Sequence, residues 1–205
     1  MHSISTTAVV MGLALTSRAS PARSASSVFD RTQIVGRDKI LLVQPTMYQV
    51  FPVSASQSSG PVPQLEVLRT GNTSVLENIV VFEGIPANAK TCSLGWTQAA
   101  KAQRTEFVVA RNGLLASQQI SRLPEGDVNW ESIAPIVEEA VEQGRPLLHP
   151  ETTGWPQIET AAGHIAGYVD CDETVYFRIQ VDDRDTDGFV YLGQNTINGL
   201  TLEVQ

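Results

Sequence analysis

The stretch "TVYFRIQV" at residues 174–181 alternates strictly between apolar and polar or amphipathic side chains. Its apolar members are Val175, Phe177, Ile179 and Val181. A period of two means that one face of the segment is buried and the other is solvated. This pattern is typical of a strand in an antiparallel sheet, which often covers a core with one face only.

The rest of the chain repeats this signal in many short stretches. "LTLEV" (200–204) alternates in the same way, and "FVYLGQ" (189–194) lies between the two. Further strand-like stretches are 39–44, 47–53, 64–69, 74–85, 90–98, 105–110 and 114–123. Residues 54–63 have a loop composition, and Asn112-Gly113 between two apolar runs predicts a hairpin. We therefore predict a mainly β protein, an antiparallel β-sandwich of jelly-roll or immunoglobulin-like type.

One segment has a helical period instead. In "NWESIAPIVEEAVEQG" (129–144), apolar residues recur at helical spacing and the glutamates fall on the opposite face. Pro135 fits a first turn, which predicts a helix start between Ser132 and Ala134, and Gly144 predicts its end. The following residues, 145–164, contain three prolines and predict a long Pro-rich loop over the end of the sandwich.

The N-terminus indicates export from the cell. An apolar run of about ten residues, "TAVVMGLALT", precedes a stretch of small residues, which is the pattern of a signal peptide. We predict a signal peptide over 1–19 with cleavage after Ala19 (Ala22 and Ala25 are alternatives), a flexible leader over 20–38, and one β-sandwich domain over 39–205. An apolar content of 42% is enough for a core. The net charge of −8 disfavours binding to nucleic acid or to an anionic membrane.

Two covalent features fit an exported protein. Cys92 and Cys171 are the two cysteines, and an even count predicts one disulfide, with two buried thiols as the alternative. Asn72 begins the sequon Asn-Thr-Ser in a turn-like stretch, which predicts a glycosylation site.

Catalytic motifs are missing from the sequence. No nucleophile elbow, phosphate-binding loop or His-Glu-x-x-His zinc motif occurs. Trp130 and Trp155 flank the irregular middle segment and are candidates for stacking on sugars, although tryptophan more often packs in a core. A pair of acidic residues for sugar hydrolysis is a further alternative, but no spacing singles out one pair.

The acidic segment "DDRDTDG" (182–188) resembles the start of a calcium loop. Asp183, Asp185 and Asp187 have the appropriate spacing, but the twelfth position is Gln194 and the flanks are strand-like, so an EF-hand is excluded. We predict a hairpin turn between the strands at 174–181 and 189–194, with a non-EF calcium turn as the alternative. No other cofactor is expected.

Several stretches together resemble a known family. "IPANAKTCSL" (85–94), the strand after Cys171 and the ending "GLTLEV" (199–204) are similar to fungal secreted proteins with a But-type C-terminal domain, a family named after a ubiquitin-pathway-binding yeast protein. The resemblance covers about residues 39–204 and implies a β-sandwich that is secreted or wall-associated. It supplies no catalytic residues. Because export places the chain outside the cytosol, we discount a ubiquitin-pathway partner.

We therefore expect a secreted, non-enzymatic β-sandwich protein of the cell surface or cell wall. Its expected partner is a cell-wall glycan or a host surface component, and its oligomeric state is open. The alternatives are a glycan-binding module that uses Trp130 or Trp155, and a secreted hydrolase with an unrecognised acidic pair.

Overall fold

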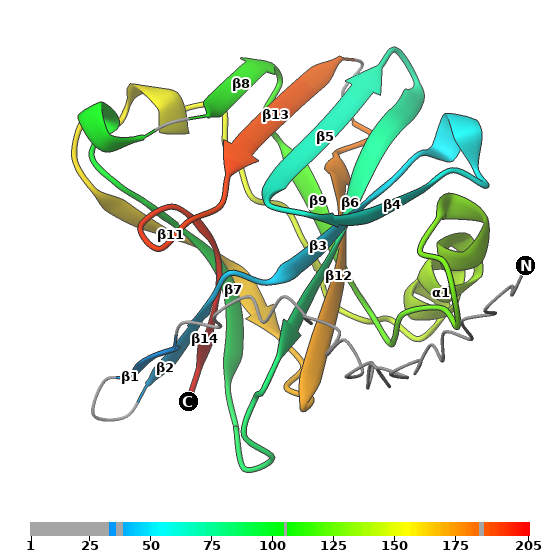
Figure 1. The fold of residues 1–205 in the computed structure, drawn as a ribbon, viewed down its shortest axis with the longest axis horizontal. Coiled ribbons are helices and arrows are strands. Elements are labelled where there is room, and N and C mark those ends of the chain that lie inside the picture. Colours follow the sequence, from blue (N-terminus) through cyan, green and yellow to red (C-terminus); the bar gives the residue numbers. More distant parts are fainter. Residues whose placement is uncertain (1–32, 36–38, 105, 185–186) are drawn as a thin grey trace, which may run out of the picture.

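The computed structural model describes residues 33–35, 39–104, 106–184 and 187–205, which form two antiparallel sheets and one α-helix (Figure 1). The five-stranded sheet has the order β1 (Gln33–Val35), β2 (Ile40–Val43), β14 (Gly199–Val204), β7 (Cys92–Gln98) and β11 (Ala162–Val169). The nine-stranded sheet runs β10 (Leu147–Leu148), β9 (Leu115–Ile120), β12 (Thr174–Val181), β6 (Thr73–Glu83), β5 (Gln64–Thr70), β13 (Gly188–Gly193) and β8 (Phe107–Arg111). Two further strands, β3 (Thr46–Val50) and β4 (Ser58–Val62), join it beside β6. The prediction of a mainly β, antiparallel fold with one short helix is confirmed.

The main core lies between the two sheets. Leu94, Trp96 and Leu202 from the five-stranded sheet and Phe177 and Leu192 from the nine-stranded sheet are at most 2% exposed and belong to one apolar cluster. Two sheets that share one core in this way form a sandwich. The choice between a jelly-roll and an immunoglobulin-like arrangement stays a prediction.

Strand β12 has the buried and solvated faces that its sequence predicts. Val175, Phe177, Ile179 and Val181 are at most 1% exposed and face the five-stranded sheet. The alternate residues Tyr176, Arg178 and Gln180 are partly exposed and lie on the opposite face. This opposite face is the one that carries the helix.

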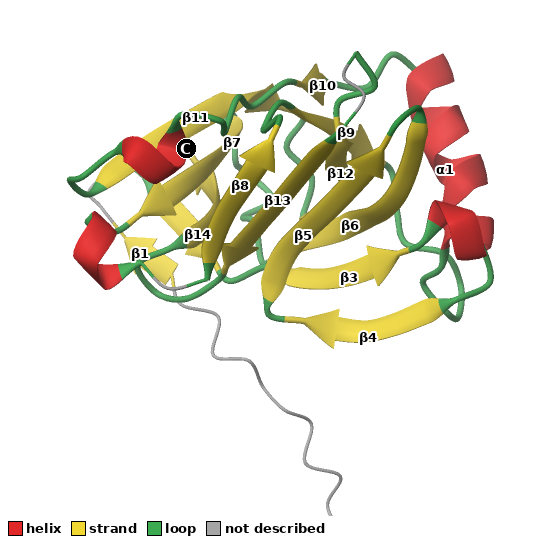
Figure 2. Ribbon diagram, turned by 90° about the horizontal axis from the view of Figure 1, so that it is seen from above, coloured by secondary structure: helices red, strands yellow, loops and turns green. Residues whose placement is uncertain are grey.

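Helix α1 (Trp130–Glu142) packs on the outer face of the nine-stranded sheet (Figure 2). It starts at Trp130 because the Asn129 side chain accepts a hydrogen bond from the Ser132 backbone N–H, while the Ser132 hydroxyl accepts one from the Asn129 N–H. This capping box satisfies two free donors at the helix start. The predicted start between Ser132 and Ala134 is wrong: Pro135 is accommodated in the second turn.

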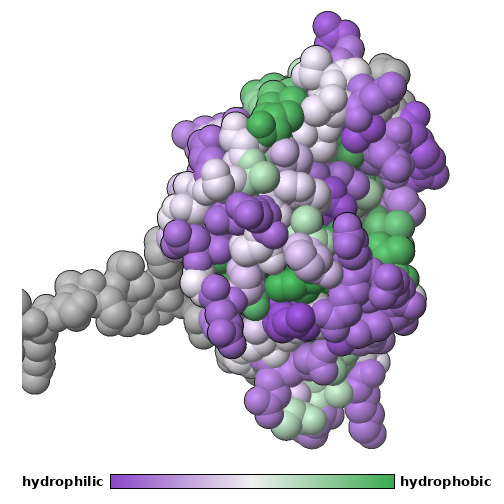
Figure 3. Space-filling view, turned by 90° about the vertical axis from the view of Figure 1, so that its right-hand side faces the viewer, coloured by the Kyte–Doolittle hydropathy of each residue, from purple (hydrophilic) through white to green (hydrophobic). Residues whose placement is uncertain are grey.

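The helix ends as its glycine predicts. Gly144 has φ +66° and donates to the carbonyl of Val141, while Arg145 donates to the carbonyl of Ala140. These two bonds form a Schellman motif, which requires a residue in the left-handed conformation and so favours glycine. Figure 3 shows the side of the molecule that carries α1, where hydrophilic residues dominate. Glu138 and Glu142 of α1 are exposed, in agreement with the predicted solvated face.

A buried ion pair lies between α1 and the sheet. Arg178 of β12 donates two hydrogen bonds to the Glu77 carboxylate of β6, at 2.6 and 2.7 Å, and one to Gln180 at 2.7 Å. Its guanidinium carbon lies 4.9 Å from the centre of the Trp130 ring. Glu77 is fully buried, so the pairing with Arg178 is the interaction that allows a carboxylate at this position.

The predicted hairpin at Asn112-Gly113 is wrong. Strand β8 pairs with β13, whereas β9 pairs with β10 and β12. Gly113 accepts hydrogen bonds from Thr152 and its N–H donates to the Thr153 hydroxyl. A Cβ at residue 113 would lie 2.5 Å from Thr152 Oγ1. The glycine therefore permits close packing against the 152–153 segment rather than a two-residue turn.

The predicted hairpin turn at 182–188 is also wrong. Strand β12 pairs with β6 and β9, and β13 pairs with β5 and β8, so the segment connects strands that are not neighbours. Sequence periodicity identifies each strand but contains no information on its partner, which is why two connected strands were expected to pair.

Four strands are not predicted by the sequence. β4 lies in the predicted loop 54–63, β10 lies and β11 begins within the predicted loop 145–164, and β1 extends the sheet into the predicted leader 20–38. β11 contains Gly163 and Gly167, which have low strand propensity, and is held by its pairing with β7. Short 3₁₀ turns occupy Pro52–Ser54, Lys101–Gln103 and Trp155–Gln157. The predicted signal peptide lies outside the described residues.

Candidate functional site

The predicted disulfide is confirmed. Cys92 at the start of β7 and Cys171 in the connection from β11 to β12 are bonded, with Cα atoms 5.4 Å apart. Cys171 stands where the chain passes from one sheet to the other. The bond therefore ties the five-stranded sheet to the segment that leads into the nine-stranded sheet.

The acidic segment at 182–188 is held by hydrogen bonds from a backbone N–H and from an arginine. Asp187 accepts from the Gly71 N–H at 2.9 Å and from Arg111 at 3.2 Å. Asp183 is exposed, and Asp185 lies outside the described residues. The described part of the chain contains no group of three or more metal-binding side chains. The calcium turn stays a prediction.

Asp182, at the start of this segment, has a buried side chain that contacts Arg184 and His149. Its carboxylate accepts two hydrogen bonds from the Arg184 side chain at 2.8 Å and lies 2.7 Å from Nδ1 of His149. The hydrogen bonds from Arg184, and to a lesser degree the one from His149, hold the pKa of Asp182 well below its usual range, against the opposing effect of burial. The carboxylate is therefore a structural acceptor at neutral pH.

The predicted glycosylation site, Asn72, is exposed in the turn between β5 and β6. Its backbone carbonyl accepts a hydrogen bond from Arg69 at 3.2 Å. Glycosylation of Asn72 stays a prediction, which mass measurement of the secreted chain would test.

The two predicted sugar-stacking tryptophans lie on opposite faces of the nine-stranded sheet. Trp130, the first residue of α1, packs against the apolar cluster between the helix and the sheet, and the Arg178 guanidinium lies over its ring. Trp155 packs against the inter-sheet core, with its ring 4.1 Å from the His164 ring and nearly parallel to it, and 6.1 Å from Trp96. Both are partly exposed. They do not form one platform, and a sugar-binding role for either stays a prediction.

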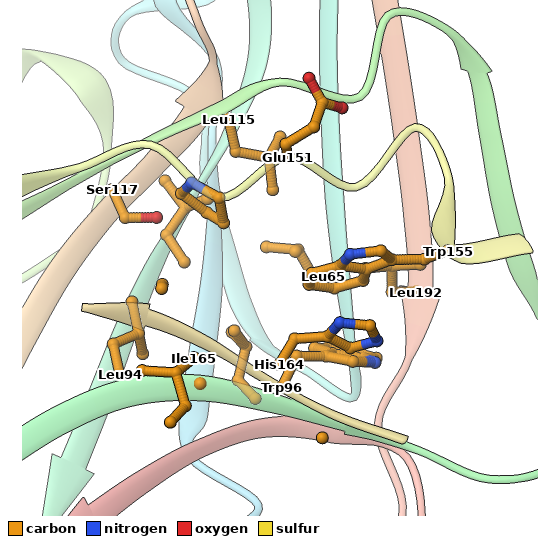
Figure 4. Close-up of a pocket in the computed structure, with 16 residues that line it drawn as sticks. Leu65, Leu94, Trp96, Leu115, Ser117, Glu151, Trp155, His164, Ile165 and Leu192 are labelled. Atoms are coloured by element: carbon orange, nitrogen blue, oxygen red, sulfur yellow. The ribbon is translucent and has the colours of Figure 1, made fainter. Parts of the chain in front are cut away.

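A cavity of about 400 Å³ lies between the two sheets (Figure 4). Most of its lining is apolar and comes from strands of both sheets: Leu65, Leu94, Gly95, Trp96, Leu115, Gly163, Ile165, Ala166, Ile179, Leu192 and Leu200. The remaining lining residues are Ser117, Pro150, Glu151, Trp155 and His164. Protein interiors contain few voids larger than a water molecule, so a space of this size is a departure from normal packing. Its volume lies in the range of small-molecule pockets, about 300–1,000 Å³.

The cavity lies beside edge strand β11, where the sandwich is covered by the Pro-rich segment. Pro150, Glu151 and Trp155 of this segment line the cavity, and Ile165 of β11, which also lines it, is 76% exposed. The segment is fixed by Arg104, which donates to the carbonyls of Trp155 and Ile158. The prediction that the Pro-rich segment lies over the end of the sandwich agrees with this position, although part of it forms β10 and β11.

Several polar atoms in the lining have no hydrogen-bond partner in the described part of the structure. They are Ser117 Oγ, Trp96 Nε1 and His164 Nε2. Burial, and secondarily the charge of Arg104, lowers the pKa of His164 below its ordinary value, so its ring is neutral at pH 7. The cavity therefore combines mostly apolar lining residues with a few uncharged hydrogen-bonding groups and one exposed carboxylate, that of Glu151.

Sequence reasoning missed this site for a physical reason. Most of its residues come from strands β5, β7, β9, β11, β12, β13 and β14, and apart from His164 these are apolar or small, as core residues are. The local signal was weak: the inward face of β9 carries Ser117 and Gln119 beside Leu115, where a strand that faces a core usually has apolar residues.

Comparison with protein-family models, curated proteins and solved structures found no match for this chain. The resemblance to the But-type domain therefore stays a prediction. Among the described residues, no helix has the length and apolar character needed to cross a bilayer.

Proposed function

We propose that this chain is a non-enzymatic binding protein that holds a small, mainly apolar molecule between its two sheets. The observation that carries the proposal is the 400 Å³ cavity with an apolar lining and unpartnered polar atoms. Ligand pockets combine a mostly apolar wall with a small number of polar groups that orient the ligand. The driving force for binding is the removal of apolar surface from water.

The proposal sets the protein outside the cell, at the cell surface or in the cell wall. Support comes from the apolar leader and from the disulfide, since disulfides persist in oxidising compartments. In this setting the ligand is a component of the wall or of a host surface. The hydrolase alternative needs two carboxyl groups near one bond. Among the described lining residues Glu151 supplies one, so a second would have to come from elsewhere.

The test uses N-phenyl-1-naphthylamine, a neutral dye whose fluorescence rises in an apolar site. The blocking variant is Ala166→Phe, because Ala166 lines the cavity and packs against the core. The matched control is Ala110→Phe on β8, since Ala110 is exposed and does not line the cavity. Both variants add the same side chain to a strand.

We expect saturable binding of one dye molecule to the wild-type chain and to Ala110→Phe. Ala166→Phe should raise the dissociation constant by at least about tenfold, which corresponds to about 1.4 kcal/mol. Thermal unfolding of each variant shows whether it is folded at the assay temperature. Equal binding by Ala166→Phe and Ala110→Phe, or no binding by the folded wild-type chain, would contradict the proposal.

A further inference from the structure

Ser117 is one of the polar residues among the mostly apolar lining of the cavity. It lies on β9, is 1% exposed, and its hydroxyl has no hydrogen-bond partner within the described structure. Figure 4 shows this hydroxyl pointing toward the centre of the cavity, with Trp155, His164 and Trp96 stacked on the other side. A buried hydroxyl without a partner is unfavourable, by about 1–3 kcal/mol. A ligand atom that bonds to it would remove this penalty.

The charges of the lining restrict what that ligand atom is. Glu151 and His164 are the titratable side chains among the described lining residues. Glu151 is exposed and accepts a hydrogen bond from the Thr153 N–H at 2.8 Å. His164 has a lowered pKa and is neutral at pH 7. The lining therefore offers no cation to pair with an anionic ligand, and its one carboxylate, on the exposed Glu151, would contribute little by pairing with a cationic ligand.

Arg104 is the cation that acts on His164, but it does not line the cavity. Its guanidinium donates to the carbonyls of Trp155 and Ile158 and lies 5.1 Å from the centre of the Phe107 ring. These contacts hold the Arg104 side chain against the Pro-rich segment that covers the cavity. An isolated charge in an apolar site is strongly unfavourable without a partner, so a carboxylate in this cavity would be excluded.

We infer that the cavity selects an uncharged apolar molecule that carries one hydroxyl or carbonyl oxygen, and that this oxygen bonds to the Ser117 hydroxyl. The inference rests on the proposed function and adds the chemical class of the ligand. A serine hydroxyl both donates and accepts, so it pairs with either oxygen. Trp96 Nε1, a donor only, provides a second group that donates a hydrogen bond to a carbonyl oxygen of the ligand.

The experiment measures displacement of N-phenyl-1-naphthylamine from the full chain by four ligands of equal length at pH 7.5. They are octan-1-ol, octan-2-one, octanoate and octan-1-amine, which is cationic at this pH. The same titrations are done with Ser117→Ala and with the control Ser93→Ala. Ser93 is a buried serine on β7 that does not line the cavity.

We expect the alcohol and the ketone to displace the dye at concentrations at least about tenfold below those of both ions. Comparison of the alcohol with the ketone identifies which oxygen the site prefers. Ser117→Ala should weaken octan-1-ol binding by about two- to tenfold, as expected for one lost hydrogen bond, without changing dye affinity. Ser93→Ala should leave both unchanged.

Octanoate that binds as tightly as octan-1-ol would overturn the inference, as would an alcohol affinity that is the same in Ser117→Ala and wild type. Either result, with the dye still bound, leaves the proposed function standing. Failure of the dye and of all four ligands to bind would overturn both.

Discussion

Removal of one member of the Glu77–Arg178 pair should destabilise the fold more than removal of both. Glu77 is fully buried, whereas the Arg178 side chain is 16% exposed and has a second acceptor in Gln180. Arg178→Met leaves a buried carboxylate without its two hydrogen bonds, which we expect to cost about 3–5 kcal/mol. Glu77→Leu leaves the arginine with Gln180 and some water, so we expect a smaller loss of about 2–3 kcal/mol.

The double variant Glu77→Leu/Arg178→Met buries no charge. It loses the contact of Arg178 with the Trp130 ring, which is worth about 1 kcal/mol in a partly buried setting. We therefore expect a total loss of about 1 kcal/mol, at least about 4 kcal/mol less than the sum of the single losses. The hydrophobic pair replaces the ion pair without leaving either group unpaired.

Urea denaturation followed by far-ultraviolet circular dichroism gives the unfolding free energies. Arg122→Met is a matched control, because Arg122 forms an exposed ion pair with Glu139 at 2.8 Å. Exposed pairs contribute little, so we expect a loss below about 1 kcal/mol. Single losses that add up to the double loss within about 0.5 kcal/mol would refute the reasoning, because they would mean that the two charges are not coupled in the folded protein.

Three further predictions concern other elements. Replacement of Cys92 and Cys171 by alanine should lower the unfolding free energy by about 4 kcal/mol, as calculated for a loop of 79 residues; an unchanged urea midpoint would exclude this. Because Arg184 depresses the pKa of Asp182, its carboxylate stabilises the fold above about pH 4, the unfolded pKa, and this contribution is lost as the pH falls further. The stability difference between wild type and Asp182→Asn should therefore shrink from pH 7 to pH 2.5 in melting experiments, and a constant difference would contradict it. Asn129→Ala should remove the cap of α1 and cost about 1 kcal/mol in urea denaturation, whereas a loss near zero would mean that the cap is not needed.

The sequence predicted elements whose signal is local. The alternation in β12 and the glycine that ends α1 are set by a few neighbouring residues, and both were predicted correctly. The start of α1 differs from the prediction because capping by Asn129 outweighs the preference of Pro135 for a first turn. A strong cap fixed the first turn, and the second turn tolerated Pro135 at the loss of one hydrogen bond.

Features that depend on distant pairing were not predictable in this way. Asn112-Gly113 has the composition of a hairpin turn, but Gly113 is required by its contact with Thr152, 39 residues away. Strand β11 has weak propensity and exists because β7 pairs with it. The cavity is the extreme case: Leu65 and Leu200 line it together, and nothing in the local sequence of either identifies a binding site.

The position of β14 in the five-stranded sheet has a consequence for synthesis on the ribosome. β14 is the middle strand of that sheet and pairs on one side with β2, so that Ile40 lies opposite Val204. After residues 40–43, more than 150 further residues must therefore be synthesised before the partner strand leaves the exit tunnel. At about 5–20 residues per second this delay is on the order of ten seconds or more, during which the edge of the apolar β2 that faces β14 is unpaired. A chaperone that binds this segment, or translocation that keeps it extended, would protect it until the sandwich closes.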